Sequence, residues 1–392
     1  MRFTHREHPG RCVRLAYCMN LHAAEDLEGI LEGIRSVTLP LRDKLSPPGE
    51  WFGVGMYLPF TVADQLQRSP DLLKLRRFVK QERLDPFTFN AFPYGGFQTD
   101  GLKRKVFHPN WLHPLRLAYT RHVARIAAFL HAGVARRVSI STHCGGFGNE
   151  VEDALLVEKL RAAADALAHL KPDLGNSVVL GLEAEPRSNC NDTAAAGALL
   201  RRVGDTHGNL GLCLDACHSA VEFEEPRAAL AAALSAGPLA KLQYTSALRL
   251  EAPAKNPAGW RALLDMDEPR YLHQVTARAG KDLRRFNDLD ELRRVDPEGL
   301  DELRCHFHVP VDREELGSGL RTTRGHAEAL LDLLLDAPAS WGSEELHVEI
   351  ETYTWDVLPG SARGPGSLVE GLEREYRHVI GRLEARGWAR AG

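Results

Sequence analysis

The feature that most constrains the fold is a regular alternation of short β-rich runs with longer amphipathic stretches. Nine runs have the length and composition of buried strands: 13–22, 52–59, 86–93, 137–145, 177–186, 210–218, 240–248, 303–311 and 346–355. Between most of them apolar residues recur at helical spacing, as in 24–36, 114–133, 149–170, 225–237, 324–337 and a final stretch near 367–387. This cadence predicts parallel strands joined by right-handed crossovers.

Eight such units predict an α/β fold of the (β/α)8 TIM barrel type, which leaves one strand surplus. The interval 249–312 breaks the rhythm, so we interpret it as a long insertion after strand 7 that carries 271–278 and 303–311 as extra strands. Strand 8 is then 346–355, and residues 1–392 form a single domain. A doubly wound open sheet is the alternative, but the first strand leads into CMNLHAAED, without a glycine-rich phosphate loop.

The composition argues against several classes of function. The 49 basic and 53 acidic residues give a net charge of −4, which does not suit a nucleic-acid or membrane surface. The sequence shows neither a secretory signal nor an apolar run long enough to span a membrane. The 7 cysteines lie mostly within strand-like runs, as reduced thiols do. We therefore expect a cytoplasmic protein that does not bind nucleic acid.

Potential metal ligands collect where the predicted strands end, which is where barrels of this type carry their functional side chains. Strand 5, VVLGLEAEP, ends in Glu183 and Glu185, whose side chains point the same way and repel each other unless a cation intervenes. Other strand ends and the insertion add Asn20, His22, Asn90, His143, Asp215, His218, Gln243, His306, His308 and Glu351. Carboxylates from three strands with interleaved histidines predict a divalent metal: zinc or manganese first, then cobalt or magnesium.

Each of these residues also has a purely structural interpretation. The glutamate pair of strand 5 could be held at the rim by an arginine such as Arg187. Asp215 could cap the following helix. His306 and His308, two residues apart, could face the core and donate to carbonyl oxygens. Their joint occurrence at matching strand ends favours the metal site.

The endings GLEAEP, LDACH and IETYT of strands 5, 6 and 8 resemble the xylose isomerase-like superfamily of divalent-metal TIM barrels. That group includes sugar isomerases, ketose epimerases and DNA repair enzymes of the endonuclease IV type. The resemblance implies that Glu183, Asp215 and Glu351 bind metal, and that His218, in the D-x-x-H pattern, contacts substrate or a second metal.

Strand 7 departs from the superfamily pattern, because Gln243 stands where these barrels have histidine. Either fewer strong ligands hold the metal, or His306 or His308 replaces the missing imidazole. The stretch HFHVPVDREELGSGL is also similar to the loop after strand 7 of endonuclease IV, where an aspartate and a histidine bind an extra zinc. At the matching position after DR this chain has Glu314.

The resemblance also implies catalytic roles for three carboxylates. Glu183 and Glu351 would act as acid and base, and Glu185 would face the substrate or a second cation. Glu185 stands where isomerases of the superfamily often carry lysine, which argues against a hydride shift. Residues expected to contact the substrate are His22, Asn90, Tyr94, Phe97, His143 and Arg187. The segment NAFPYGGF, which carries three of them, could instead be an ordinary Pro-Gly turn.

A closer resemblance runs along nearly the whole chain. The segments LAYCMNLHAAEDLEGIL, FNAFPYGGF, LEAEPRS, CLDACHSAV, HFHVPV and ETYTWDVLP occur in the order found in the EboE-type metabolite traffic proteins of bacteria. This resemblance implies a role in processing or delivering a small metabolite. It also implies partners that are membrane-associated or prenyltransferase-like.

Three functions follow from these patterns. A metal-dependent isomerase or epimerase that acts on a polyhydroxylated or carbonyl metabolite is favoured. A phosphoester hydrolase of the endonuclease IV type would need several metals and a basic surface, which the charge balance does not supply. A non-catalytic metabolite carrier would bind its ligand equally well without metal.

Overall fold

Eight parallel strands form the barrel that the alternation predicts. The computed structural model describes residues 1–67, 69–130, 137–174, 177–358 and 365–391. The barrel strands are β2 (Cys12–Tyr17), β3 (Phe52–Tyr57), β4 (Leu84–Asn90), β5 (Arg137–His143), β6 (Ser177–Glu183), β7 (Leu210–Asp215), β8 (Leu239–Tyr244) and β15 (Glu345–Ile350). They pair in the order β2-β15-β8-β7-β6-β5-β4-β3, and a parallel bridge between Cys18 and Gly55 joins the two ends of this series. The short strands β1 (Arg2–His5) and β16 (Trp388–Arg390) extend the sheet antiparallel beside β2.

The barrel strands are short and almost entirely buried. Parallel strands covered on both faces need near-continuous apolar sequence, which explains runs such as VVLGL in β6. The register sets Leu15 of β2 beside Val348 of β15, and Val348 beside Leu242 of β8. The strand-end residues therefore share one end of the barrel.

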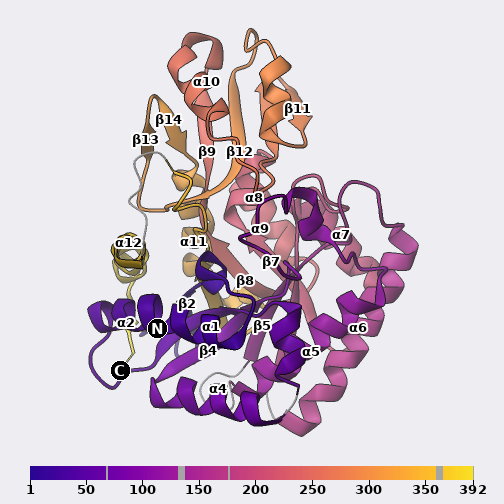
Figure 1. Cartoon of the computed structure of the whole chain (residues 1–392), viewed down its shortest axis with the longest axis vertical. Helices are drawn as coiled ribbons and strands as arrows, with labels where there is room; N and C mark the ends of the chain where they lie inside the picture. The colour runs from indigo at the N-terminus through magenta and orange to yellow at the C-terminus, as the bar shows by residue number, and fades with distance from the viewer. Residues whose placement is uncertain (68, 131–136, 175–176, 359–364, 392) are drawn as a thin grey trace.

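Helices surround the barrel between its strands (Figure 1). They are α1 (Leu27–Gly33), α2 (Leu39–Leu45), α3 (Phe60–Gln65), α4 (Ser69–Gln81), α5 (Pro114–Leu130), α6 (Asp153–Leu174), α7 (Thr193–Val203), α8 (Ala216–Val221), α9 (Pro226–Leu234), α11 (Arg324–Asp336) and α12 (Pro365–Ala385). Local sequence fixes several ends: Asp192 accepts the Ala195 N–H before α7, and Gly204 ends it at φ +65°. Across the described ranges, every helix is too short or too polar to cross a membrane.

A second sheet lies between β8 and β15 in the chain and above the barrel in Figure 1. It contains β9 (Ser246–Glu251), β10 (Val275–Ala279), β11 (Asp282–Phe286), β12 (Glu302–Val309), β13 (Glu315–Gly317) and β14 (Leu320–Thr322), with helix α10 (Pro257–Leu264). The order is β11-β10-β12-β9-β14-β13, all antiparallel. These strands extend beyond the expected insertion 249–312 on both sides, and Thr245 alone separates β8 from β9.

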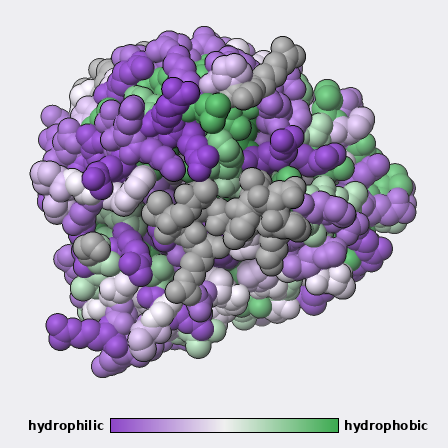
Figure 2. All heavy atoms as spheres, turned by 90° about the horizontal axis from the view of Figure 1, so that it is seen from below, coloured by the Kyte–Doolittle hydropathy of each residue, from purple (hydrophilic) through white to green (hydrophobic). Residues whose placement is uncertain are grey.

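The second sheet has an apolar core of its own, which includes Leu250, Val275, Leu303 and Phe307. Strand β12 runs through that core and ends at the barrel mouth. The face turned away from the second sheet is largely hydrophilic, with smaller apolar patches between (Figure 2). At the mouth, side chains of the barrel and of the second sheet line one cavity.

Candidate metal centre

Three carboxylates that the sequence predicts as ligands converge at the carboxyl ends of β6, β7 and β15. Glu183, Asp215 and Glu351 each offer an oxygen, and these oxygens lie within 4.8 Å of one another. Glu183 Oε2 and Asp215 Oδ2 are buried without a hydrogen-bond partner. Asp215 does cap α8, because its Oδ1 accepts the His218 N–H at 2.9 Å, but the second oxygen remains available. We call these three residues the carboxylate cluster.

Three amide side chains hold Glu351. The Nδ2 groups of Asn20 and Asn90 donate to its Oε1 at 2.8 and 2.9 Å, and Gln243 Nε2 donates to its Oε2. The Gln243 carbonyl in turn accepts from the Cys213 thiol at 2.6 Å. Gln243 was predicted as a ligand, and in this arrangement its amide orients Glu351 instead.

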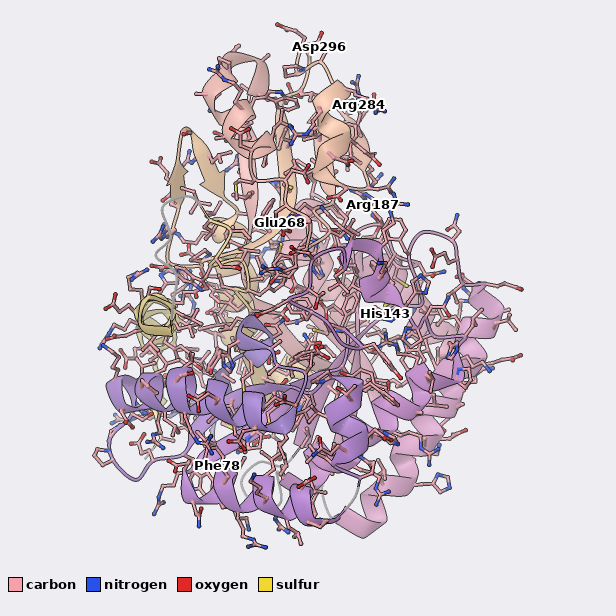
Figure 3. The ribbon with its side chains drawn as sticks, viewed as in Figure 1. Phe78, His143, Arg187, Glu268, Arg284 and Asp296 are labelled. Carbon is pink, nitrogen blue, oxygen red and sulfur yellow. The ribbon has the colours of Figure 1, made fainter. Side chains whose placement is uncertain are left out.

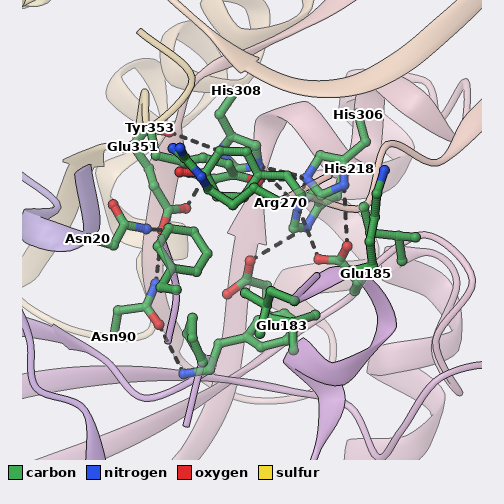
Figure 4. A pocket seen from close by; sticks show the side chains of 18 residues that line it. Asn20, Asn90, Glu183, Glu185, His218, Arg270, His306, His308, Glu351 and Tyr353 are labelled. Carbon is green, nitrogen blue, oxygen red and sulfur yellow. Dashed lines mark hydrogen bonds and ion pairs between the residues drawn. The ribbon is translucent and has the colours of Figure 1, made fainter. Parts of the chain in front are cut away.

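Three imidazoles converge next to the carboxylate cluster. The Nε2 atoms of His218, His306 and His308 lie 2.9–3.2 Å from one another (Figure 4). His306 and His308 come from β12 of the second sheet, whereas His218 lies on α8 of the barrel. We call these residues the histidine cluster.

The hydrogen bonds of the histidine cluster fix its tautomers. His218 Nδ1 faces the Ala184 carbonyl and His308 Nδ1 faces the Glu351 carbonyl, both at 2.9 Å. A carbonyl oxygen only accepts, so both Nδ1 atoms carry hydrogen. His306 Nδ1 likewise donates to Gln274 Oε1, since the Gln274 amide nitrogen is used by Glu185 and by the Pro186 carbonyl. In the neutral form of each ring, Nε2 therefore presents its lone pair toward the other two rings.

Facing lone pairs repel, so the histidine cluster fits a bound cation. Two nitrogens on one tetrahedral ion at roughly 2.0–2.1 Å lie about 3.3 Å apart, close to the spacing of these Nε2 atoms. Glu185 Oε2 lies 3.2 Å from His218 Nε2, so this carboxylate could complete the shell. The expected substitution of the strand 7 histidine by His306 or His308 is thus compatible with the geometry.

Burial dominates the electrostatics of the centre. It raises the pKa of Glu183 well above its ordinary value, and the charges of Glu351 and Asp215 add to the effect. Burial also lowers the pKa of His308 to about 4 and that of His306 well below its usual range. His306 and His308 are therefore neutral near pH 7, the form in which imidazole binds metals.

A cavity of about 60 Å³ opens above both clusters. Its floor consists of Asn20, Asn90, Glu183, Glu185, His218, His306, His308 and Glu351 (Figure 4). Phe97, expected to contact a substrate, lines the wall. The second sheet and its loops supply Arg270, Tyr271 and Leu272 on the other side.

Four residues predicted to contact the substrate lie outside the cavity lining. The strand expected over 13–22 turns into a 3-10 helix at Met19, so His22 Nε2 pairs with the Tyr17 hydroxyl at 2.9 Å. Tyr94 stacks on Phe60 with ring centroids 4.6 Å apart.

The other two serve the packing of the barrel and the second sheet. His143 lies at the end of β5 behind Phe92, with ring centroids 5.0 Å apart. Arg187 pairs with Glu222 at 2.8 Å and donates to the Val275 carbonyl of β10, which joins the loop after β6 to the second sheet (Figure 3).

Two further residues belong to the centre. Asn20, which follows the first strand as Asn90 follows the third, was predicted among the potential ligands, and its amide holds Glu351. Sequence reasoning missed Gln274, which orients both His306 and Glu185, because it precedes β10 in the insertion, away from the barrel strand ends on which the prediction relied.

Known structures share this architecture at low sequence identity. A xylose isomerase-like TIM barrel protein from Mycobacterium smegmatis in complex with magnesium aligns with 95% of this chain and 97% of its own, at 12% identity and a TM-score of 0.52. This chain therefore has a TIM-barrel fold. No protein-family model and no curated protein matches the chain.

Two further structures illustrate the range of proteins with this likeness. A D-psicose 3-epimerase in the presence of D-fructose aligns with 94% of this chain and 99% of its own, at 12% identity and a TM-score of 0.49. An IolI protein with a bound zinc atom aligns with 95% of this chain and 99% of its own, at 11% identity and a TM-score of 0.49. At such identities the likeness concerns the fold.

Proposed function

We propose that this chain is a divalent-metal enzyme that moves a proton on a small carbonyl compound, in the manner of an isomerase or epimerase. The observation that carries the proposal is the convergence of three imidazole Nε2 atoms beside three buried carboxylates at a barrel mouth. The histidine cluster suits zinc or cobalt, whereas the carboxylate cluster suits manganese or magnesium.

The chemistry assigned to each part follows from its donors. A bound divalent ion would polarise the carbonyl of the ligand. Glu183 and Glu351 line the cavity, and in this proposal they would remove and return a proton at the neighbouring carbon. Glu185, held by Gln274 at 2.7 Å, faces the ligand or a second ion. Asn20, Asn90 and Gln243 are positioning residues that orient Glu351.

Metal content tests the first half of the proposal. Protein purified without chelators should contain at least about one equivalent of a transition metal, and His308→Ala should lose most of it. His326→Ala is the matched control, because this histidine pairs with Ser219 at 3.0 Å away from the cavity. Metal below about half an equivalent in the unmodified protein would contradict the proposal.

Proton movement tests the second half. Metal-loaded protein should exchange the carbon-bound hydrogens next to the carbonyl of a hydroxyketone for deuterium in heavy water, followed by NMR. Glu183→Gln and Glu351→Gln should each slow the exchange by about 10²–10⁴-fold while the protein still binds the hydroxyketone. Ligand binding that is unchanged after metal removal, without exchange, would instead indicate a carrier.

The order of motifs shared with EboE-type proteins supports a wider role in bacterial metabolite traffic. In that role the chain processes or delivers a small metabolite in the cytoplasm, beside membrane-associated or prenyltransferase-like partners. Co-purification of such a partner from bacterial extract tests this extension, and a tagged chain that retains neither kind of partner would count against it.

A phosphoester hydrolase is the second candidate. The two adjacent ligand clusters favour it, because pairs of metal ions serve in-line displacement at phosphate. Hydrolysis of bis(p-nitrophenyl) phosphate by the metal-loaded protein, lost in Asp215→Asn, would support this function over the first.

A further inference from the structure

The cavity has two chemically different parts. Its floor carries the carboxylate and histidine clusters, and its wall is built mostly from Phe92, Phe97, Leu102, Val106, Tyr271 and Leu272. The cavity volume of about 60 Å³ restricts the site to a small ligand. Polar recognition is therefore concentrated at one end of whatever binds.

The two cations at the rim are already matched by acids. Lys103 Nζ lies 2.9 Å from Asp288 and 3.6 Å from Asp267. Arg270 pairs with Asp356 at 2.7 Å. Because these partners neutralise the rim, it does not attract a phosphate or carboxylate on the body of the ligand.

The wall is held in place before any ligand binds. Glu268 accepts the N–H groups of Arg270 and Tyr271 at 2.8 and 2.6 Å, which fixes the loop that carries Tyr271. The rings of Phe97, Tyr271 and Tyr353 contact one another with centroids 5.0–5.4 Å apart. A flat apolar group entering the cavity meets ring faces and edges there.

We propose that the ligand of this site is a small hydroxy-carbonyl compound with an uncharged, flat, apolar body, and that polyhydroxylated sugars are poor ligands. The inference rests on the proposed function, since the oxygen-bearing head would face the two clusters. Hydroxyl groups on the body of a sugar would lie against leucine, valine and phenylalanine and lose their hydrogen bonds to water.

Two compounds with the same head and different bodies test the inference. 2-Hydroxyacetophenone carries a phenyl ring, whereas dihydroxyacetone carries a hydroxymethyl group. Isothermal titration calorimetry with the full-length protein should give a dissociation constant at least about tenfold lower for the phenyl compound. The preference should persist, at weaker affinity, after metal is removed, because the wall is unaffected.

Variants of the wall sharpen the test. Leu272→Asn should reduce the preference for the phenyl compound at least about threefold, because it places a polar group where the body lies. Phe78→Ala is the matched control, since this ring packs on α4 under Arg35, far from the mouth, and should leave the ratio unchanged (Figure 3).

The outcomes separate this inference from the proposed function. Metal-loaded protein that binds dihydroxyacetone as tightly as the phenyl compound, or that binds neither at millimolar concentration, overturns the inference about the ligand. Protein that holds no metal contradicts the proposed function, and a retained phenyl preference in that protein would still support the apolar body.

Discussion

Beneath the cavity, buried charges of the barrel are matched by opposite charges, whereas on the cavity floor buried carboxylates face one another. Arg14 lies 2.7 Å from Asp85 and 2.9 Å from Glu345, and Lys241 pairs with Glu349 in the layer just below the floor. Two residues further along β15 and its continuation, Glu351 meets other acids and neutral amides.

The contrast teaches how to tell a structural buried charge from a functional one. In a buried ion pair, the attraction between the partners offsets part of their desolvation cost, so no further ligand is required. A buried cluster of acids with free oxygen lone pairs is costly until a cation arrives. The four predictions below act on one side of this contrast or the other.

The largest effect is expected beneath the cavity. Lys241→Met should lower the free energy of unfolding by about 3–5 kcal/mol, because it leaves Glu349 buried without its cation. Denaturant unfolding measures the change. The double variant Lys241→Met/Glu349→Leu should recover most of the loss. If the single variant costs less than about 1 kcal/mol, the paired charges beneath the cavity do not differ in this way from the carboxylates on its floor.

Metal removal should be the next largest effect. Exhaustive chelation should lower the free energy of unfolding by about 2.7 kcal/mol relative to protein with free metal at 100 times its dissociation constant. Thermal melts of chelated and reloaded samples measure this difference. Identical melting temperatures would place the carboxylate and histidine clusters among structural features.

The third prediction concerns the buried pair of Arg14 and Glu345. It uses the acid limb of the stability curve, which is the fall in the free energy of unfolding as the pH is lowered. Burial opposes ionisation of Glu345, but His347 and Arg14 outweigh it and lower its pKa. This contribution is therefore present above the unfolded pKa of about 4.3 and is lost as the pH falls through the folded pKa. Glu345→Gln should reduce the stability lost on acidification. The reduction should be about 1.4 kcal/mol for each unit by which the folded pKa of Glu345 lies below its unfolded pKa.

The matched reference for that experiment is an exposed acid. Glu370→Gln on α12 should leave the acid limb unchanged, since the residue is exposed on the barrel surface. A Glu345→Gln protein with the same acid limb as the unmodified chain would show that the pair contributes no linked stability.

The smallest effect has the opposite sign. In metal-depleted protein, Glu183→Gln should raise the free energy of unfolding by about 1 kcal/mol, because it removes one of three mutually repelling buried acids, and its Oε2 has no hydrogen-bond partner to lose. The same variant should destabilise metal-loaded protein. Denaturant curves with and without metal give both values, and a loss of stability in both states would show that the Glu183 charge stabilises the fold even without metal.

Much of the fold followed from local patterns. The eight barrel strands and the helices between them were confirmed, because apolar runs and helical periodicity are short-range properties. The predicted strand over 240–248 joined β8 to β9, since apolar composition does not reveal the change of sheet at Thr245.

The candidate centre was only partly predictable. Parallel strands bring their carboxyl ends together, so the grouping of Glu183, Asp215 and Glu351 follows from strand order alone. His143 and Arg187 occupy strand-end positions too, but packing turned them to Phe92 and to Glu222. The position of a residue at the end of a barrel strand predicts that it lies near the mouth, but it does not predict where its side chain points.

The sequence by itself determined a parallel barrel with an acidic mouth, because period and composition are read along the chain. Only the tertiary structure decided that the Nε2 atoms of His306 and His308, from the second sheet, meet that of His218 from the barrel. That meeting depends on residues such as Gln274, whose hydrogen bonds set an imidazole tautomer from 32 positions away. Contacts of this kind arise from packing between distant segments, which leaves no periodic signal in the chain.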